Sequence, residues 1–444
     1  MKKLIPIIGL EVHIELSTES KMFCGCPADH FAKEANTQVC PVCLGLPGAL
    51  PFANAEAINR VVSFGLSMDC TIATFSKFDR KHYFYPDLPK SYQISQYDLP
   101  FCTNGRFEIV QPEGTLFVAT IRRIHLEEDT AKMQHSTVNG KRVSLVDYNR
   151  SSVPLVEMVT EPDFHDAETV ALFLKEVQKV VRYLGISTAD MEKGSMRLEA
   201  NISMAEEGYS KLPNYKVELK NINSFVFLKK ALEAEIRRQS EALERGETLI
   251  QETRGYDELH DKTVSQRIKE EAADYRYFPE PDLPPVTFTP EAILALKTHL
   301  PELPKQKKER FVAVYELSSD YADILTRERA RAEYFEAAVQ TGKTHGLTAK
   351  QIANAMINQH LDSEHAEPVS LVSFLVAALQ KEYSNEDDVV QAVTDVINQN
   401  PEVVTKYKNG KVEVLGFLLG QTQRTLKGKG EPKHIQEILQ KLLS

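Results

Sequence analysis

The chain has 444 residues, of which 42% are hydrophobic and 26% charged, and its formal net charge is −10. This composition is that of an ordinary soluble globular protein, and the length predicts more than one domain. The charge argues against nucleic-acid binding over the whole surface but allows a local basic patch. No run approaches the about 18 apolar residues of a membrane span, and Glu11 interrupts the apolar run at the amino terminus. We therefore expect a cytoplasmic protein without membrane association.

The stretch 9–16 alternates apolar and polar side chains, and its polar set is Glu11, His13 and Glu15. Because side chains of a strand alternate between its faces, the polar and apolar sets lie on opposite sides. One face should pack on a core, while the other presents two carboxylates and an imidazole. These ligand types suit a divalent cation. The alternative is an edge strand with a solvated polar face.

Four of the six cysteines form two close pairs with the spacing C-x-C-x13-C-x2-C. Two short chelating pairs joined by a loop are typical of a tetrahedral zinc site. Disulfides are disfavoured in a cytoplasmic chain, and a thioredoxin-like redox motif needs only one pair. Four thiolates leave no open coordination position, so the pattern predicts a structural rather than a catalytic zinc ion. The predicted ligands are Cys24, Cys26, Cys40 and Cys43.

A helix is predicted over residues 54–67, with Asn54 as its N-cap. Basic and aromatic side chains then interleave over residues 77–90. Such a segment can hold phosphates and stack a base, or it can be a packed loop with its charges in solvent.

Strand-like patterns dominate from about residue 94 to residue 160, and two acidic features stand out among them. Three consecutive acids, Glu127, Glu128 and Asp129, end one strand, and burying them requires a cation or hydrogen-bond donors. Glu157 is the only charge in the apolar stretch 153–159 and also needs a partner.

A helix over residues 167–184 is predicted to end at Gly185. The stretches 195–203 and 216–221 then repeat the alternation of the first strand. If the three strands are neighbours in an antiparallel sheet, their polar faces form one floor of carboxylates, guanidinium and ammonium groups. Cations that neutralise phosphates and carboxylates that hold those cations are what phosphoryl transfer requires.

No phosphate-binding glycine loop competes with this floor, because position 337 of the nearest approach, which ends in Gly342-Lys343-Thr344, is Ala337. A long helix is predicted over residues 225–246, and prolines before residue 285 indicate a domain boundary at 285–295. Helical patterns follow over residues 348–360, 369–382, 386–398 and 432–443.

The last segment, residues 401–444, carries eight Lys and Arg against four Glu, a local charge of +4. Lys427-Gly428-Lys429-Gly430 precedes the final helix, and basic glycine turns at helix starts suit contacts to backbone phosphates. The alternative is a solvated basic face.

Long motifs of the first 290 residues closely resemble those of the B subunits of bacterial aspartyl/glutamyl-tRNA amidotransferases. They are Gly-Leu-Glu-Val-His at 9–13, Lys-Phe-Asp-Arg-Lys at 77–81, Tyr-Phe-Tyr-Pro-Asp at 83–87, Tyr-Gln-Ile-Ser-Gln at 92–96, His-Leu-Glu-Glu-Asp at 125–129, Glu-Leu-Lys-Asn-Ile-Asn-Ser at 218–224, Gln-Glu-Thr-Arg at 251–254 and Asp-Tyr-Arg-Tyr-Phe-Pro-Glu-Pro-Asp at 274–282.

The resemblance implies an α+β catalytic domain with the glutamine-synthetase fold. It implies that ATP phosphorylates the side-chain carboxylate of Glu or Asp misacylated on tRNA(Gln) or tRNA(Asn). Ammonia from an amidase partner subunit then displaces the phosphate, and a small third subunit clasps the other two. The family's magnesium ligands fall on Glu11, His13, Glu128 and Glu157, and some members carry the four-cysteine zinc site that this chain keeps.

Arg197, Glu199 and Lys220 face the same side as Glu11 by their strand positions. We expect Arg197 and Glu199 to take part in catalysis, and Arg197 and Lys220 to help hold the nucleotide. The predicted domains are a catalytic domain over 1–290 with the zinc loop at 24–43, a helical domain over 291–365, and a basic, tRNA-binding helical tail over 366–444.

Two departures from the family concern the tail. The helical region over residues 345–400 is shorter than the family norm by about one helical pair, and residues 420–424 read Gly-Gln-Thr-Gln-Arg, where the family usually ends in Met and Lys. Two rival functions stay open. One is a ligase that amidates a free amino acid, against which the basic tail counts. The other is a non-catalytic, zinc-stabilised tRNA-binding subunit, which would not require the polar strand faces.

Overall fold

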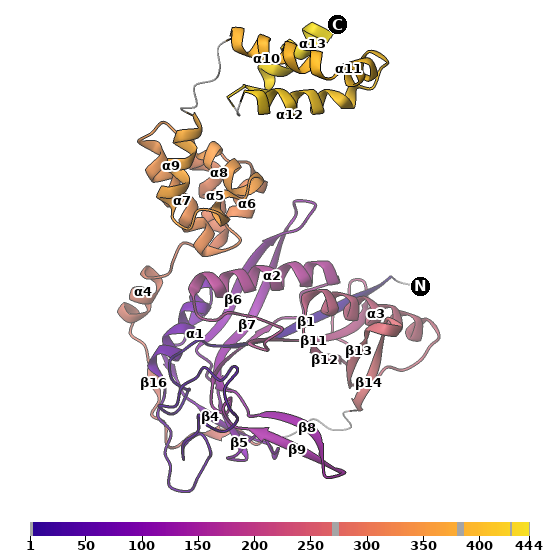
Figure 1. The fold of residues 1–444 in the computed structure, drawn as a ribbon. Helices are drawn as coiled ribbons and strands as arrows, with labels where there is room; N and C mark the ends of the chain where they lie inside the picture. The colour runs from indigo at the N-terminus through magenta and orange to yellow at the C-terminus, as the bar shows by residue number, and fades with distance from the viewer. Residues whose placement is uncertain (1–2, 269–274, 380–385, 427–428, 444) are drawn as a thin grey trace. The chain divides into compact units, whose positions relative to one another are not determined.

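The computed structural model describes residues 3–268, 275–379, 386–426 and 429–443. The chain divides into two compact units, one of Met1–Phe311 with Thr326–Arg329 and the other of Val312–Leu325 with Ala330–Ser444. A large sheet and its helices form the first unit, and the second is helical (Figure 1). The α+β class predicted from the sequence is therefore confirmed, while the three-part division at residues 290 and 365 stays a prediction.

Within the described residues, the first unit is built on a nine-stranded sheet whose one parallel pair is β12 with β13. Its central strand is β1, the strand predicted from the first alternating stretch. The strands, in spatial order, are β14 (Lys262–Ile268), β13 (Glu252–Asp257), β12 (Val217–Ile222), β11 (Met196–Glu206), β1 (Leu4–Glu15), β10 (Pro154–Thr160), β7 (Leu116–Glu128), β6 (Cys102–Val110) and β2 (Thr71–Ile72).

Smaller pairings accompany this sheet, and the hairpin of β8 and β9 extends away from it (Figure 1). They are β15 (Phe278–Pro279) with β4 (Asp79–His82) and β5 (Tyr92–Ser95), β16 (Val286–Thr287) with β3 (Phe75–Ser76), and β8 (Lys132–Val138) with β9 (Lys141–Asp147).

Three helices cover one face of the large sheet: α1 (Ala55–Ser67), α2 (Ala167–Leu184) and α3 (Phe225–Glu244) (Figure 1). The side chain of Asn54 accepts a hydrogen bond from the amide of Ala57 and caps α1, as predicted. Gly185 ends α2 in the left-handed conformation with φ of 67°, also as predicted.

The apolar face of β1 supplies the centre of the core. Leu10, Val12 and Ile14 are at most 1% exposed and join apolar side chains of α1, α2 and α3 in one cluster. The strand therefore has the buried apolar face that its alternation predicts. Its neighbours β10 and β11 bring their own polar residues to the opposite face, and β12 lies beside β11. The three alternating strands are thus adjacent, as the polar floor requires.

The helices after the sheet carry the second unit and the chain leading to it. The predicted N-cap Thr348 forms a capping box with Gln351 at the start of α8. Residues 380–382 of the predicted helix 369–382 lie outside the described residues. The helices are α4 (Pro290–Thr298), α5 (Pro304–Tyr315), α6 (Ser319–Leu325), α7 (Arg329–Lys343), α8 (Ala349–Asn358), α9 (Pro368–Leu379), α10 (Glu386–Gln399), α11 (Pro401–Lys408), α12 (Leu415–Thr425) and α13 (Pro432–Leu443), with short 3-10 turns η1 (Glu258–His260), η2 (Leu361–Ser363) and η3 (Val412–Val414).

Helices α10, α12 and α13 share a small core of their own, to which Val393, Leu418 and Leu439 contribute fully buried side chains. Among the described residues, no helix has both the length and the apolar character needed to cross a membrane.

Candidate active site and metal centre

The polar face of the sheet gathers acids and imidazoles at its centre. Strand β10 lies between β1 and β7, and the register places Glu157 opposite His13 on one side and opposite His125 on the other. Glu127 follows His125 by two residues on β7, so its side chain points to the same face. Antiparallel pairing therefore brings residues from three distant parts of the chain to one place.

His13, Glu127 and Glu157 are close enough to share one cation. The Nε2 atom of His13 lies 3.3 Å from Oε2 of Glu157 and 3.9 Å from Oε1 of Glu127. One potential ligand atom from each residue lies within 4.8 Å of the others. Glu127 and Glu157 are 2% and 6% exposed, and two buried carboxylates at this spacing need positive charge between them. The set therefore fits a divalent cation with oxygen and nitrogen ligands.

The surroundings keep both carboxylates ionised. Burial raises the pKa of Glu157, but the imidazoles of His125 and His13 outweigh it and hold that pKa well below the usual value. Burial likewise opposes ionisation of Glu127, yet the neighbouring His125 imidazole, whose Nε2 lies 3.7 Å from Oε2, lowers the pKa of Glu127. For His13, burial lowers the pKa, while the hydrogen bond and charge of Glu157 raise it to about 9. The site thus holds two ionised carboxylates, while His13 would have to lose its proton before its Nε2 could bind a cation.

Glu128 does not lie with this group, although the family resemblance implies that it is a magnesium ligand. Its carboxylate accepts hydrogen bonds from Lys90 Nζ, 2.7 Å from Oε1, and from the amide of Ile94 at 2.9 Å. Consecutive strand residues face opposite sides, so Glu127 takes the position on the polar face. The alternation of Arg123, His125 and Glu127 is the signal in the sequence that distinguishes the two acids.

Glu11 lies beside the cluster, on the same face of β1 as His13. Its Oε1 accepts a hydrogen bond from Asn201 Nδ2 at 3.0 Å, and its register partner on β11 is Glu199. Burial, followed by repulsion from Glu157 and Glu199, raises the pKa of Glu11. A cation near Glu11 would relieve this repulsion.

The remaining predicted residues, Arg197, Glu199 and Lys220, lie on the same floor and form ion pairs there. Lys220 Nζ lies 2.7 Å from Glu199 Oε2 and 3.3 Å from Glu218 Oε1. A guanidinium nitrogen of Arg197 lies 2.5 Å from Asp129 Oδ2. The alternation of β11 and β12 is therefore enough to bring all three predicted residues to the polar side.

Lys81 is a further residue of this face that the sequence analysis does not single out. It lies on β4, and its ammonium is 5.1 Å from the centre of the Tyr275 ring. Burial lowers the pKa of Lys81, but the negative charges of Glu127 and Glu157 outweigh burial and raise it. Its signals in the sequence are its place in the interleaved basic and aromatic segment at 77–90 and at the end of the family motif at 77–81.

A pocket of about 330 Å³ opens beside Glu11 along β1. Its lining includes Gly9, Arg122, Asn201 and Tyr215. Pockets of a few hundred Å³ with a few polar groups are typical of small-ligand sites. Glu11, which lies beside the acid cluster, is therefore also part of the pocket lining.

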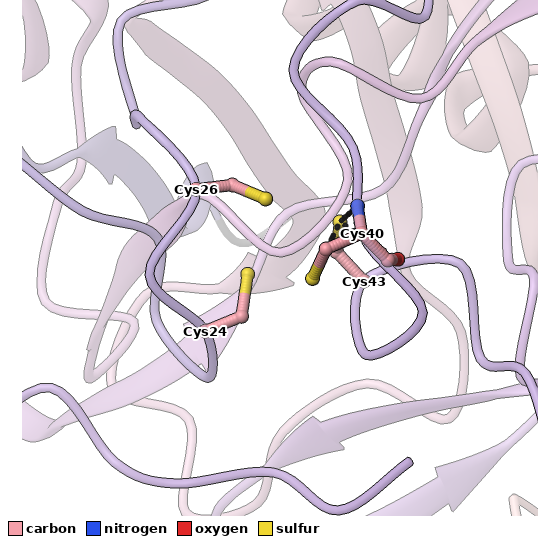
Figure 2. A group of neighbouring side chains, drawn as sticks. All are labelled: Cys24, Cys26, Cys40 and Cys43. Carbon is pink, nitrogen blue, oxygen red and sulfur yellow. Dashed lines mark hydrogen bonds between the residues drawn. The ribbon is translucent and has the colours of Figure 1, made fainter.

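The four cysteines of the predicted zinc loop converge, and all are free thiols. Their sulfur atoms all lie within 4.8 Å of one another. Figure 2 shows Cys24 and Cys26 on one segment and Cys40 and Cys43 on another, with the sulfurs directed into the space between the segments. The amide of Cys40 also donates to Cys43 Sγ at 3.2 Å (Figure 2). Four convergent sulfurs fit a tetrahedral zinc ion.

The thiols of this loop differ in acidity. The hydrogen bond from Cys24 lowers the pKa of Cys43 to about 4, with further contributions from the Cys40 amide and the Lys21 ammonium. Burial raises the pKa of Cys26 to about 11. Outside the cysteines, His30 Nε2 lies 3.0 Å from Glu15 Oε2 at the end of β1 and joins the loop to the central strand.

Known proteins resemble this chain over nearly its whole length. Residues 6–294 match the family model described as the GatB/GatE catalytic domain, and residues 331–443 match the GatB domain. The B subunit of the aspartyl/glutamyl-tRNA(Asn/Gln) amidotransferase of Thermomicrobium roseum is 44% identical over 98% of each chain. The proteins of the same name from Thermodesulfovibrio yellowstonii and Thermoanaerobacter sp. (strain X514) are both 42% identical, over 98% and 99% of each chain.

Proposed function

Because the chain belongs to the family of aspartyl/glutamyl-tRNA(Asn/Gln) amidotransferase B subunits, we propose that it activates the side-chain carboxylate of Glu or Asp misacylated on tRNA(Gln) or tRNA(Asn). The terminal phosphoryl group of ATP passes to a carboxylate oxygen, and ADP leaves. Ammonia then attacks the acyl carbon, phosphate departs, and the amide remains. The amidase partner subunit supplies the ammonia, and a small third subunit completes the complex.

The observation that carries this proposal is the cluster of His13, Glu127 and Glu157 on the polar face of the sheet. These three side chains, with Glu11 beside them, would hold magnesium. Magnesium bound there supplies the positive charge that offsets repulsion between the ATP phosphates and the substrate carboxylate. Glu128 supports the site from the other face of β7 through its pair with Lys90.

Two cationic side chains of this chain would stabilise the developing phosphate charge in this proposal. A guanidinium nitrogen of Arg123 lies 3.5 Å from Glu157 Oε1, and Lys81 is kept protonated by the same acids. Fixed positive charges near transferring phosphoryl oxygens stabilise the transition state without reorganisation. Arg197, paired with Asp129, and Lys220, paired with Glu199, lie further along the floor and would help hold the nucleotide.

The pocket beside Glu11 is the best candidate for the base and ribose of ATP. Glu11 belongs both to the pocket lining and to the acidic face, so a nucleotide seated in the pocket could direct its phosphates toward the cluster. The hydrogen bond from Asn201 fixes the Glu11 carboxylate at this junction.

Zinc at the four cysteines has a structural role in this proposal, since four sulfur ligands leave no open position. The C-terminal tail binds the tRNA body through its phosphates, because residues 401–444 carry a local charge of +4. Lys427 and Gly428 of the predicted contact turn lie outside the described residues.

The test is ATP hydrolysis by the complex with its partner subunits, measured with and without misacylated tRNA. Under the proposal, misacylated tRNA stimulates hydrolysis and amide appears on the tRNA. Stimulation by free glutamate or aspartate would instead indicate a free amino-acid ligase. No hydrolysis in either case would leave a non-catalytic tRNA-binding subunit.

A further inference from the structure

Lys21 is a fully buried lysine that lies three residues before the first zinc-loop cysteine and takes no part in the proposed chemistry. Its backbone amide donates a hydrogen bond to the carbonyl of Cys26 at 2.9 Å. Its ammonium donates to the carbonyl oxygens of Gln38 at 2.8 Å and Tyr148 at 3.2 Å. Nζ also lies 3.7 Å from Cys43 Sγ. Lys21 therefore contacts the segment of the first cysteine pair, the segment of the second pair, and Tyr148, which follows β9.

The positive charge of the Lys21 ammonium is buried, and its polar neighbours show which group can balance it. Two of its three polar neighbours are neutral carbonyl oxygens, and the third is the Cys43 sulfur. Burying an ammonium is costly unless an anion lies beside it. Four thiolates around a divalent zinc ion carry a net charge of −2, which is itself costly to bury. The lysine and the cysteine site thus offset each other's charge.

The contacts of Lys21 also link the two cysteine pairs, which lie on separate segments of the loop. The first cysteine pair is fixed through the amide of Lys21, and the second pair through its ammonium. Ser151 Oγ donates to the carbonyl of Cys43 at 3.1 Å from the same neighbouring chain segment, which adds to this anchoring. Hydrogen bonds from outside the ligand set orient metal ligands and raise metal affinity.

We propose that Lys21 retains zinc in this loop by neutralising the tetrathiolate site and by tying its two cysteine pairs together. This inference rests on the proposed zinc site. Lys21 is a positioning residue, since it acts on the metal through Cys43 and the loop backbone.

The loop contains a matched control lysine. Lys33 carries the same charge, but its side chain is 43% exposed and its ammonium lies 3.3 Å from Asp29 Oδ2. Replacing Lys33 changes the net charge of the loop as much as replacing Lys21 does, without removing the buried contacts.

The experiment compares the wild-type chain with Lys21→Met, Lys21→Gln, Lys21→Arg and Lys33→Met in the assembled complex. Zinc content is measured first, and then the rate at which zinc passes to a chromogenic chelator at constant pH. We expect both neutral Lys21 variants to release zinc about 10- to 100-fold faster than wild type, because loss of a partner of a metal ligand typically lowers metal affinity by about that factor. Lys21→Arg should fall between, and Lys33→Met should match wild type.

Wild-type release rates in Lys21→Met and Lys21→Gln would overturn the role of Lys21. If Lys21→Met does not fold, the comparison of Lys21→Gln with Lys21→Arg tests the role of Lys21. If the side chain only fills space, zinc release should not be faster from the neutral variant than from the charged one. Wild-type protein without zinc would overturn the zinc site and this inference together. Zinc in the wild type with unchanged release in the variants would overturn this inference alone.

Discussion

Glu157 is held between two imidazoles that belong to different strands. Its Oε2 lies 3.3 Å from His13 Nε2 and 3.6 Å from His125 Nε2. The two imidazoles, His125 first and then His13, hold the pKa of this carboxylate well below its usual value although it is only 6% exposed. A buried acid without such neighbours would take up a proton and lose its value as a cation ligand.

Glu127 and Glu128 give a paired test of the site, because adjacent residues of β7 face opposite sides. Glu127→Gln removes one cation-facing charge at nearly constant volume, and we expect amide formation to fall by about 10²-fold. The magnesium concentration for half-maximal rate should rise. Both values come from a magnesium titration of amidation by the complex.

Glu128→Gln should behave differently, since it weakens the buried contacts to Lys90 and Ile94. We expect a loss of about 1–3 kcal/mol in unfolding free energy, with the magnesium dependence of amidation kept. Thermal or denaturant unfolding measures the first quantity. The opposite pattern, with Glu128→Gln shifting the magnesium dependence and Glu127→Gln only the stability, would restore the assignment that the family resemblance implies.

For individual residues, strand alternation predicts from the sequence alone that Glu11, His13 and Glu199 lie on the polar face of the sheet. It does not identify Lys81 as a neighbour of the cluster, because β4 belongs to a separate small sheet whose position depends on long-range packing. For the same reason, the sequence does not identify the partners of Glu157. The sequence shows that a lone acid needs a cation, but only the register identifies His13 and His125.

Among the elements, the cysteine loop is the most predictable from a short stretch of sequence, and the order of the strands in the sheet is the least predictable. The cysteine spacing identifies all four cysteines that the structure brings together, since the two members of each pair are at most three residues apart. Helix α2 is equally local: its periodicity and Gly185 give its range, 167–184, as the structure has it. The order of the nine strands depends on pairings such as β1 with β10, which join residues 140 to 148 positions apart.

The zinc loop leads to a direct prediction about composition. Metal analysis of the chain prepared under reducing conditions should find one zinc ion, because the four sulfurs converge in one group. Removing the metal with a chelator should expose residues 24–43 to proteolysis, since metal binding contributes folding free energy to the loop. Zinc-free protein with a disulfide between two of these cysteines would contradict the prediction.

Charge is unevenly distributed over the whole molecule. The chain carries −10 overall, yet residues 401–444 carry +4. Helices α10, α12 and α13 share a core separate from that of the sheet domain. The tail can therefore present basic residues to an anionic partner while the remainder of the chain stays acidic.

Deleting the residues after 400 should weaken tRNA binding and flatten its dependence on salt, because phosphate contacts release counterions. Glutamine hydrolysis by the amidase partner should remain largely intact. Binding titrations with tRNA at several salt concentrations, together with a glutaminase assay of the same complex, measure both effects. Unchanged tRNA affinity after the deletion would place the main tRNA contacts elsewhere.

The central claim is that the polar face of the sheet is the site of ATP-dependent carboxylate activation. It is tested most directly by amide formation on misacylated tRNA by a complex carrying Glu11→Ala, with ammonium salt in place of glutamine. Supplying ammonia directly separates activation from glutaminase action. We expect amidation to be abolished while the fold, the zinc content and tRNA binding stay near wild type, because Glu11 faces the site rather than the core. Wild-type amidation by this variant at low magnesium would show that the strand is only a polar edge and would contradict the claim.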